Sequence, residues 1–255
     1  MNNNSESVLS GERRDSLVLL LAWAAGSVDA IAYLGLGHVF TANMTGNMVL
    51  LGLTLGQGQG LAAIANVVAL AGFVFGVIIG AVSVAEGGKP GEWDRRVSRA
   101  FLWEGMLIAA FTVVWHVAPG REVRGSGAFY ALIALSAMAM GLQSAAVRRL
   151  NLPGVATTYV TGTMTSVVAG LTSRLLGKAA ESTGKEASVE KLRWKHQVRL
   201  QAGVLVTYGL AAVASGLFQK RVPRLVAVTP LVAVALVLLI VSFSHRQRES
   251  RGEGV

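Results

Sequence analysis

The chain has 255 residues, of which 53% are hydrophobic and only 15% are charged, whereas soluble globular proteins carry about 25% charged residues. It contains no cysteine, which excludes disulfides, thiol catalysis and cysteine metal sites. The net charge of +9 would suggest nucleic acid as a partner of a soluble protein. Here the basic residues flank apolar segments and no nucleic-acid-binding motif is present, so we expect no nucleic-acid partner.

Six apolar segments are long enough to cross a hydrocarbon layer ~30 Å thick as helices. The first follows a polar tail, residues 1–16, and it is too long for a signal-peptide core, so we expect it to be retained. The sequence therefore predicts an all-α integral membrane protein in a lipid bilayer, with one membrane domain over residues 17–243 and a cytoplasmic tail over residues 244–255. The spans are expected at Leu17–Gly37, Leu61–Ala85, Ala100–Ala118, Ala128–Val147, Val198–Phe218 and Leu225–Phe243.

The positions of Lys and Arg predict the orientation of the spans, because these residues concentrate in cytoplasmic loops. With six crossings and both termini in the cytoplasm, 18 of the 23 Lys and Arg residues lie inside. The five outside are Arg121, Arg124, Lys220, Arg221 and Arg224. Eight crossings would place nine of them outside, so six crossings is the better interpretation.

A polar tetrapeptide occurs twice in this apolar chain. Thr45-Gly46-Asn47-Met48 returns 116 positions later as Thr161-Gly162-Thr163-Met164. Residues 26–30 match residues 141–145 in the same way, and Gly72, Gly76 and Gly80 match Tyr208, Ala212 and Gly216. We therefore expect two repeats of three spans each, about residues 17–119 and 128–243. Because three is odd, the repeats would be inverted with respect to each other in the membrane.

Each motif stands in a segment that leaves a span and returns to the same side, Thr41–Gly56 and Thr157–Gly177. Polar backbone is costly at membrane depth unless it faces protein or water, so we expect each segment to be a short re-entrant or broken helix. Asn43, Thr45 and Thr161 are suitable N-cap residues, so each helix should begin near its Thr-Gly pair. The alternative is that Thr-Gly merely caps and kinks a continuous helix.

Two such helix N-termini would form a polar site suited to an anion or a neutral hydrogen-bonding solute. Asp29 lies near the middle of the first span, where an ionisable group usually faces a cavity or a partner. The alternative for Asp29 is a protonated carboxyl bonded to a neighbouring helix. The glycines would allow close approach of the backbone. We predict a substrate-binding site that comprises Asp29, Asn43, Thr45, Gly46, Asn47, Gln143, Ser144, Thr158, Thr161, Gly162 and Thr163.

No catalytic motif is visible in the sequence, and its four histidines lack metal-site spacing. We therefore expect a protein that is not an enzyme and that has neither a cofactor nor a bound metal. Asp29 and Glu104 form the only carboxylate pair of interest. Gly72, Gly76 and Gly80 share one helix face and predict close packing with another helix, either within the chain or in a homo-oligomer.

Four segments together carry a family resemblance. They are residues 26–30 (Gly-x-x-Asp-Ala), 40–47 (Phe-Thr-Ala-Asn-Met-Thr-Gly-Asn), 140–145 (Met-Gly-Leu-Gln-Ser-Ala) and 157–163 (Thr-Thr-Tyr-Val-Thr-Gly-Thr). In this order they resemble the YoaK-like family of bacterial membrane proteins, known as domain of unknown function 1275. The resemblance extends from the first span to the sixth and implies a bacterial inner-membrane protein of about six spans. It implies no substrate.

The expected function is a membrane transporter or channel for a small polar or anionic solute, with its site between the two Thr-Gly half-helices at mid-membrane. The alternative is a non-transporting scaffold or sensor of the same family, in which the motifs are packing elements. The two hypotheses differ in what motif variants lose first, which is solute flux in one case and stability in the other. The sequence leaves the solute, the coupling ion and the oligomeric state open.

Overall fold

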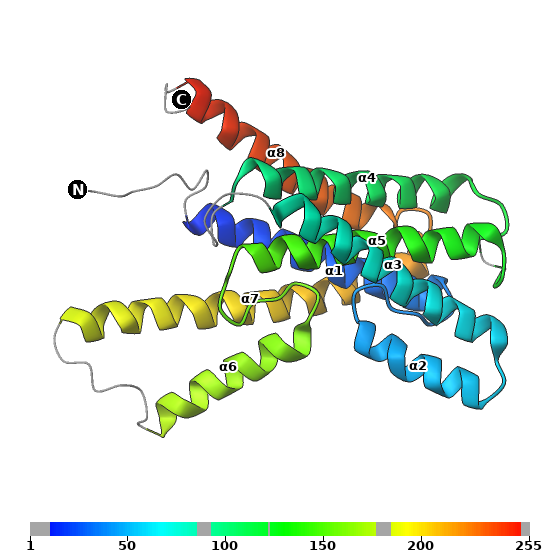
Figure 1. Cartoon of the computed structure of the whole chain (residues 1–255), viewed down its shortest axis with the longest axis horizontal. Helices are drawn as coiled ribbons and strands as arrows, with labels where there is room; N and C mark the ends of the chain where they lie inside the picture. The colour runs from blue at the N-terminus through cyan, green and yellow to red at the C-terminus, as the bar shows by residue number, and fades with distance from the viewer. Residues whose placement is uncertain (1–10, 86–92, 122, 177–184, 251–255) are drawn as a thin grey trace.

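A computed structural model describes residues 11–85, 93–121, 123–176 and 185–250 (Figure 1). Within these residues the chain forms eight helices and no strand. The helices are α1 (Gly11–Gly35), α2 (Met44–Gly56), α3 (Gly60–Ala85), α4 (Arg95–Val117), α5 (Gly127–Arg149), α6 (Val160–Leu175), α7 (Lys185–Arg221) and α8 (Val228–Ser250).

Five helices in the described residues are long and apolar enough to cross a membrane: α1, α3, α4, α5 and the Glu190–Arg221 part of α7. The first five predicted spans fall on these helices, and two of them, Leu17–Gly37 and Ala100–Ala118, end one or two residues beyond their helix. The sixth predicted span lies in α8, whose apolar part, Val228–Ser244, is shorter than the other five. Several helices begin before their apolar segments. For example, α4 starts at Arg95 because the carboxylate of Asp94 accepts hydrogen bonds from the N–H groups of Arg96 and Val97.

The two Thr-Gly motifs lie in the first turns of the short helices α2 and α6. α2 begins at Met44 and α6 at Val160, in each case one residue before the threonine of the motif. Of the three predicted N-cap residues, Asn43 does cap α2, whereas Thr45 and Thr161 lie inside the helices and Tyr159 holds the N-cap position of α6. Asn43 takes the position because its side-chain oxygen reaches the Gly46 N–H at 3.2 Å.

The packing of the helices interleaves the two halves of the chain. α1 packs against α7 and α8, while α5 packs against α3 and α4. The short helices lie on the helices that follow them, α2 on α3 and α6 on α7. The packing is the same in both halves if α1 to α4 are matched in order with α5 to α8. The contact of α1 with α7 then corresponds to that of α5 with α3, and the contact of α1 with α8 to that of α5 with α4. In Figure 1, α2 and α6 start near the middle of the bundle and run toward opposite ends.

Glycines on α3 let it approach α5 closely, as the four-residue spacing predicts. A Cβ atom at Gly72 would lie 3.0 Å from the carbonyl oxygen of Ala134, and one at Gly76 would collide with the carbonyl of Met138. At Gly80 it would lie 2.9 Å from the carbonyl oxygen of Leu142. The glycine face is therefore used within the chain.

Matching glycines hold the two central helices against their partners in the other half. A Cβ at Gly26 of α1 would collide with the carbonyl oxygen of Tyr208 on α7, and one at Gly141 of α5 with that of Phe73 on α3. Gly26 and Gly141 occupy matching places in the two repeated segments. The contact between α1 and α7 and the contact between α5 and α3 therefore each depend on a glycine at a matching position.

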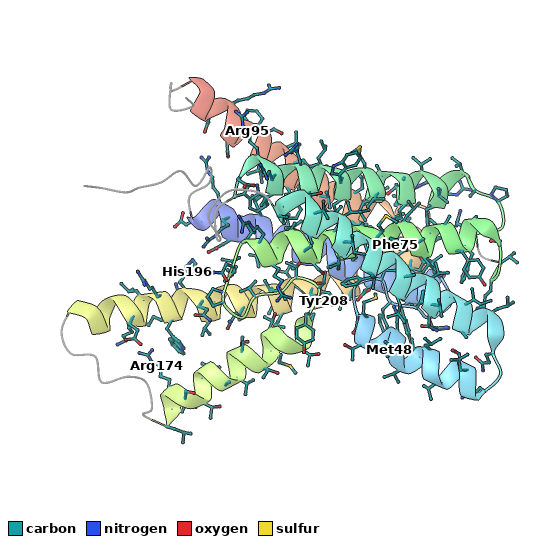
Figure 2. All side chains as sticks on the ribbon, viewed as in Figure 1. Met48, Phe75, Arg95, Arg174, His196 and Tyr208 are labelled. Atoms are coloured by element: carbon teal, nitrogen blue, oxygen red, sulfur yellow. The ribbon has the colours of Figure 1, made fainter. Side chains whose placement is uncertain are left out.

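The outer surface of the bundle is apolar. Met48 on α2 is 61% exposed and Phe75 on α3 is 59% exposed, and both lie on the outside of the helices in Figure 2. Lipid is as apolar as these side chains, so such residues give little driving force for helix association. The close glycine contacts and the buried hydrogen bonds therefore have a large share in holding the bundle together.

Replacing Gly76 by alanine should destabilise the α3–α5 contact. The added Cβ meets the Met138 carbonyl, and overpacking of this kind typically costs about 1–3 kcal/mol. Gly209→Ala is the matched control on α7, because nothing lies within 4 Å of a Cβ there and alanine is the better helix former. Thermal unfolding in detergent should show a lower Tm for Gly76→Ala and an equal or higher Tm for Gly209→Ala. Equal losses would contradict the assignment.

Candidate functional site

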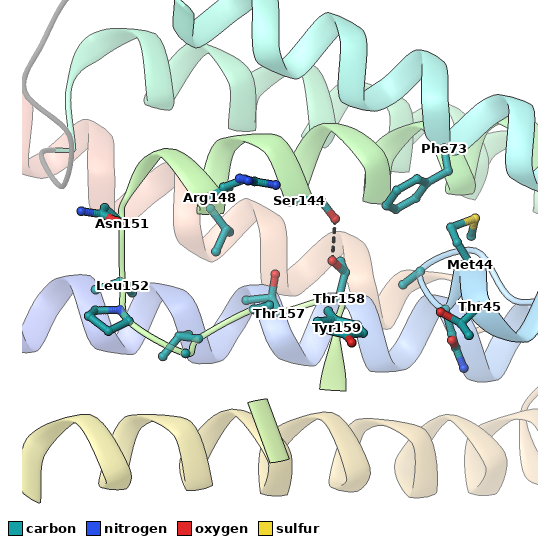
Figure 3. A pocket seen from close by; sticks show the side chains of 17 residues that line it. Met44, Thr45, Phe73, Ser144, Arg148, Asn151, Leu152, Thr157, Thr158 and Tyr159 are labelled. Atoms are coloured by element: carbon teal, nitrogen blue, oxygen red, sulfur yellow. Dashed lines mark hydrogen bonds between the residues drawn. The ribbon is translucent and has the colours of Figure 1, made fainter. Parts of the chain in front are cut away.

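A cavity of about 550 Å³ lies between the starts of the two short helices (Figure 3). Its wall comes from the end of α5, from the connections that precede α2 and α6, and from Phe73 on α3. The lining residues are Ala42, Asn43, Met44, Thr45, Phe73, Ser144, Val147, Arg148 and residues 151–159.

The cavity has an exposed rim and a buried floor. Thr45, Arg148 and Asn151 are exposed, whereas Ala42 and Thr157 are buried. Polar groups are concentrated on the α5 side, where the hydroxyls of Ser144 and Thr158 are hydrogen-bonded to each other (Figure 3). The cavity is thus a recess with polar groups in an otherwise apolar bundle.

Arg148 is the only charged residue of the lining. It stands four residues after Ser144 on α5, so both side chains occupy the same helix face. Among the described residues its guanidinium group has neither an ion-pair partner nor a hydrogen-bond partner. Its positive charge is therefore available to a bound molecule.

Asp29 anchors the connection that leads into α2. Its Oδ1 accepts hydrogen bonds from the N–H groups of Thr41 at 2.7 Å and Ala42 at 2.6 Å. Its Oδ2 accepts a hydrogen bond from the hydroxyl of Tyr208 on α7. The carboxylate is 4% exposed, and in each of these bonds it is the acceptor. It therefore joins α1, the first motif segment and α7.

Gln143 has a comparable role in the second half of the chain. Its Nε2 donates to the carbonyl of Leu21 on α1 at 3.1 Å and to the hydroxyl of Thr157 at 2.7 Å. Ser144 holds the next residue, Thr158. The polar residues of α1 and of α5 thus each fix the end of the connection, just before the short helix begins.

In each half, a side chain from the first turn of the short helix bonds both the N–H and the C=O of one residue in the preceding connection. We call this arrangement the latch. In the first half, the Asn47 side chain accepts from the Phe40 N–H at 2.8 Å and donates to the Phe40 carbonyl at 2.6 Å. In the second half, the Thr163 hydroxyl accepts from the Ala156 N–H at 3.2 Å and donates to the Ala156 carbonyl at 3.3 Å. Both pairs are seven residues apart, and each residue of one pair lies 116 positions from its counterpart.

The glycines of the two motifs are covered by aromatic rings. A Cβ at Gly46 would lie 2.9 Å from the Phe40 ring, and one at Gly162 would collide with the Tyr159 ring. Neither glycine lines the cavity. Their role in this structure is to leave space for a ring that closes the turn.

The structure divides the eleven predicted site residues into three groups. Asn43, Thr45, Ser144 and Thr158 line the cavity. Asp29, Asn47, Gln143 and Thr163 are buried and hold the connections in place. Gly46, Thr161 and Gly162 lie in the first turns of α2 and α6 without lining the cavity, and Thr161 is exposed.

Sequence reasoning missed Arg148, Asn151 and the connection around Gly154. The helical spacing from Ser144 was a usable signal for Arg148, whereas the path of residues 151–156 depends on tertiary contacts. Among these, the side chains of Gln197 and Gln201 on α7 donate to the Pro153 carbonyl. Glu104 is fully buried on α4 and lies outside the cavity lining.

Comparison with known proteins identifies the family. A family described as "Protein of unknown function (DUF1275)" matches residues 17–243. The chain belongs to this family. It is 32% identical to the UPF0700 transmembrane protein YoaK of Bacillus subtilis (strain 168) over 221 residues, which cover 87% of this chain and 91% of that protein. No solved structure matches.

Membership in this family, together with the apolar helices, establishes an all-helical, multi-pass membrane protein. The Asp29 contacts, the latches and the cavity then lie among membrane-embedded helices. Every backbone group in these broken segments needs a partner in the protein or in trapped water. The hydrogen bonds of the connections are therefore needed to keep the chain stable in the membrane, and they also shape the cavity.

Asn47→Ala should destabilise the protein, because it leaves the N–H and C=O of Phe40 without their side-chain partner. A buried polar group that loses its partner costs about 1–3 kcal/mol. Met48→Ala, at a neighbouring position that is 61% exposed, is the control and should have little effect. Thermal unfolding in detergent measures both variants. An Asn47→Ala variant as stable as the control would show that the latch has no structural importance.

Proposed function

We propose that the chain is a membrane transporter or channel for a small anionic solute, and that it is built from two inverted repeats of three spans and one half-helix each. The observation that carries the proposal is the polar cavity at the point where α2 and α6 begin. A membrane protein that breaks two helices at one place, with a cavity between them, has the layout of many solute sites in transporters.

Several features support the inverted repeat. The two latches, the two glycine crossings and the interleaved helix pairs each relate one half of the chain to the other. In Figure 1, α1 begins and α8 ends at the same end of the bundle, which is what six crossings require. The excess of Lys and Arg assigns that end to the cytoplasm. The end of α5, and with it Arg148, would then face the cytoplasm as well.

The chemistry of the lining favours an anion. Arg148 supplies a positive charge to the lining. Guanidinium groups attract anions. The hydroxyls of Ser144 and Thr158 and the amide of Asn151 add hydrogen-bonding groups.

The same lining argues for transport rather than catalysis. It contains no Asp, Glu or His among the described residues, so its groups suit recognition by hydrogen bonds and charge more than acid–base chemistry. We accordingly propose a protein that binds and releases its solute unchanged and needs no cofactor.

Arg148→Gln should reduce anion flux by at least tenfold, because it removes the only charge of the lining. Arg149→Gln is the matched control, since Arg149 is the next residue on α5 and does not line the cavity. Purified protein would be reconstituted into vesicles of zwitterionic lipid, with and without added anionic lipid. Light scattering would follow the entry of chloride, nitrate, acetate and, as neutral probes, urea and glycerol.

Three results would contradict the proposal in whole or in part. Unchanged anion flux in a folded Arg148→Gln variant would refute the role of this residue. Flux of the neutral probes alone would replace the anion by a neutral solute. No flux of any probe through the parent protein would favour the scaffold. If anionic lipid abolishes anion flux through the parent but not through Arg148→Gln, the headgroup competes for the same guanidinium.

A further inference from the structure

Three residues of the cavity lining have aromatic counterparts in the first half of the chain. At the 116-residue offset of the motifs, Gly154 corresponds to His38, and Ala156 corresponds to Phe40. At the offset of 115 that relates residues 26–30 to residues 141–145, Arg148 corresponds to Tyr33. A glycine, an alanine and an arginine on one side thus correspond to three aromatic residues on the other.

The backbone at these positions is also equivalent. His38 and Gly154 have the same φ of 65°. Phe40 and Ala156 are each held by the latch of their own half. A left-handed conformation costs histidine more than glycine, so the first half keeps a bulky ring at a position where the backbone favours a small residue.

Tyr33 contacts the other two aromatic residues of this set in the first half. The ring of Tyr33 stacks on the ring of Phe40 with centroids 5.1 Å apart, and the ring of His38 meets that of Tyr33 edge-on at 4.9 Å. The Phe40 ring in turn covers Gly46 in the first turn of α2. Tyr33 and His38 are exposed and Phe40 is half-buried, so the rings lie at the surface of the bundle, between the end of α1 and the start of α2. The matching positions in the second half line the cavity.

We propose that Tyr33, His38 and Phe40 form an aromatic barrier that closes the solute pathway on the outer side, while the cavity is open toward the cytoplasm. This inference rests on the proposed transport function and on its inverted repeat. The stacked rings can separate without breaking the latch, because the latch uses only the backbone of Phe40. Passage of a solute requires that separation.

Site-directed thiol labelling tests the barrier, because the chain has no cysteine of its own. Thr158→Cys places a reporter in the cavity lining. In cells that express this variant, a membrane-impermeant maleimide added outside should react slowly, whereas in inside-out vesicles it should react fast. Adding Tyr33→Ala and Phe40→Ala should raise the outside rate at least tenfold. Alanine is tolerated at the equivalent position 156, so the Phe40→Ala backbone should keep its latch.

Two controls make the result decisive. Phe75→Ala removes an exposed aromatic ring on α3, remote from the barrier in sequence, and should leave the outside rate unchanged. Tyr33→Ala alone retains Phe40 and should give an intermediate rate, which keeps the test valid if the double variant folds poorly.

The barrier is refuted if outside labelling is unchanged in the folded double variant, or if the parent reporter already reacts equally from both sides. These outcomes are separate from the failure of the transport proposal. Anion flux through the parent protein, together with unchanged labelling, would leave transport intact and remove the barrier. Faster labelling without any flux would keep the barrier and remove transport.

Discussion

Backbone polar groups at membrane depth must find partners inside the protein, and this constraint shapes the centre of the molecule. The chain breaks after α1 and after α5, and each break frees N–H and C=O groups that lipid cannot satisfy. Asp29 binds two N–H groups of the first connection, and Asn47 binds both polar groups of Phe40. Gln143 and Thr163 have corresponding places in the second half. These side chains allow helices to start in the middle of the bundle, and the cavity exists only because the helices start there.

The structural roles and the proposed binding roles therefore fall on different residues of the same motifs. Buried members, such as Asn47 and Thr163, maintain the shape of the connections. Members on the cavity wall, such as Thr45 and Thr158, are available to a solute. Substitutions in the buried group are expected to destabilise the protein. Substitutions on the cavity wall are expected to stop flux while the protein stays folded. The scaffold hypothesis has no need of this division.

Much of the fold could be predicted from the sequence, because hydropathy and length determine which segments can span a membrane. The two Thr-Gly motifs predicted two short helices that begin at them, and the glycine spacing on α3 indicated its close contact. Arg148 could have been found from its helical spacing to Ser144, but the rest of the cavity wall could not be predicted, because the connection near Gly154 reaches it through the path of residues 151–156. That path depends on contacts with α7, such as the hydrogen bond from Gln201 to Pro153. Asn43 was correctly predicted as an N-cap, whereas Thr45 and Thr161 were not caps for a related reason, since the place where the chain turns determines which residue caps the helix.

The central claim is that solute passes through the cavity between α2 and α6. The most direct test joins Thr45→Cys and Thr158→Cys, one from each motif segment, with a cleavable thiol cross-linker in reconstituted vesicles. The account predicts that anion flux stops when the cross-link forms and returns when the linker is cleaved. Undiminished flux through fully cross-linked protein would show that the pathway lies elsewhere and would contradict the account.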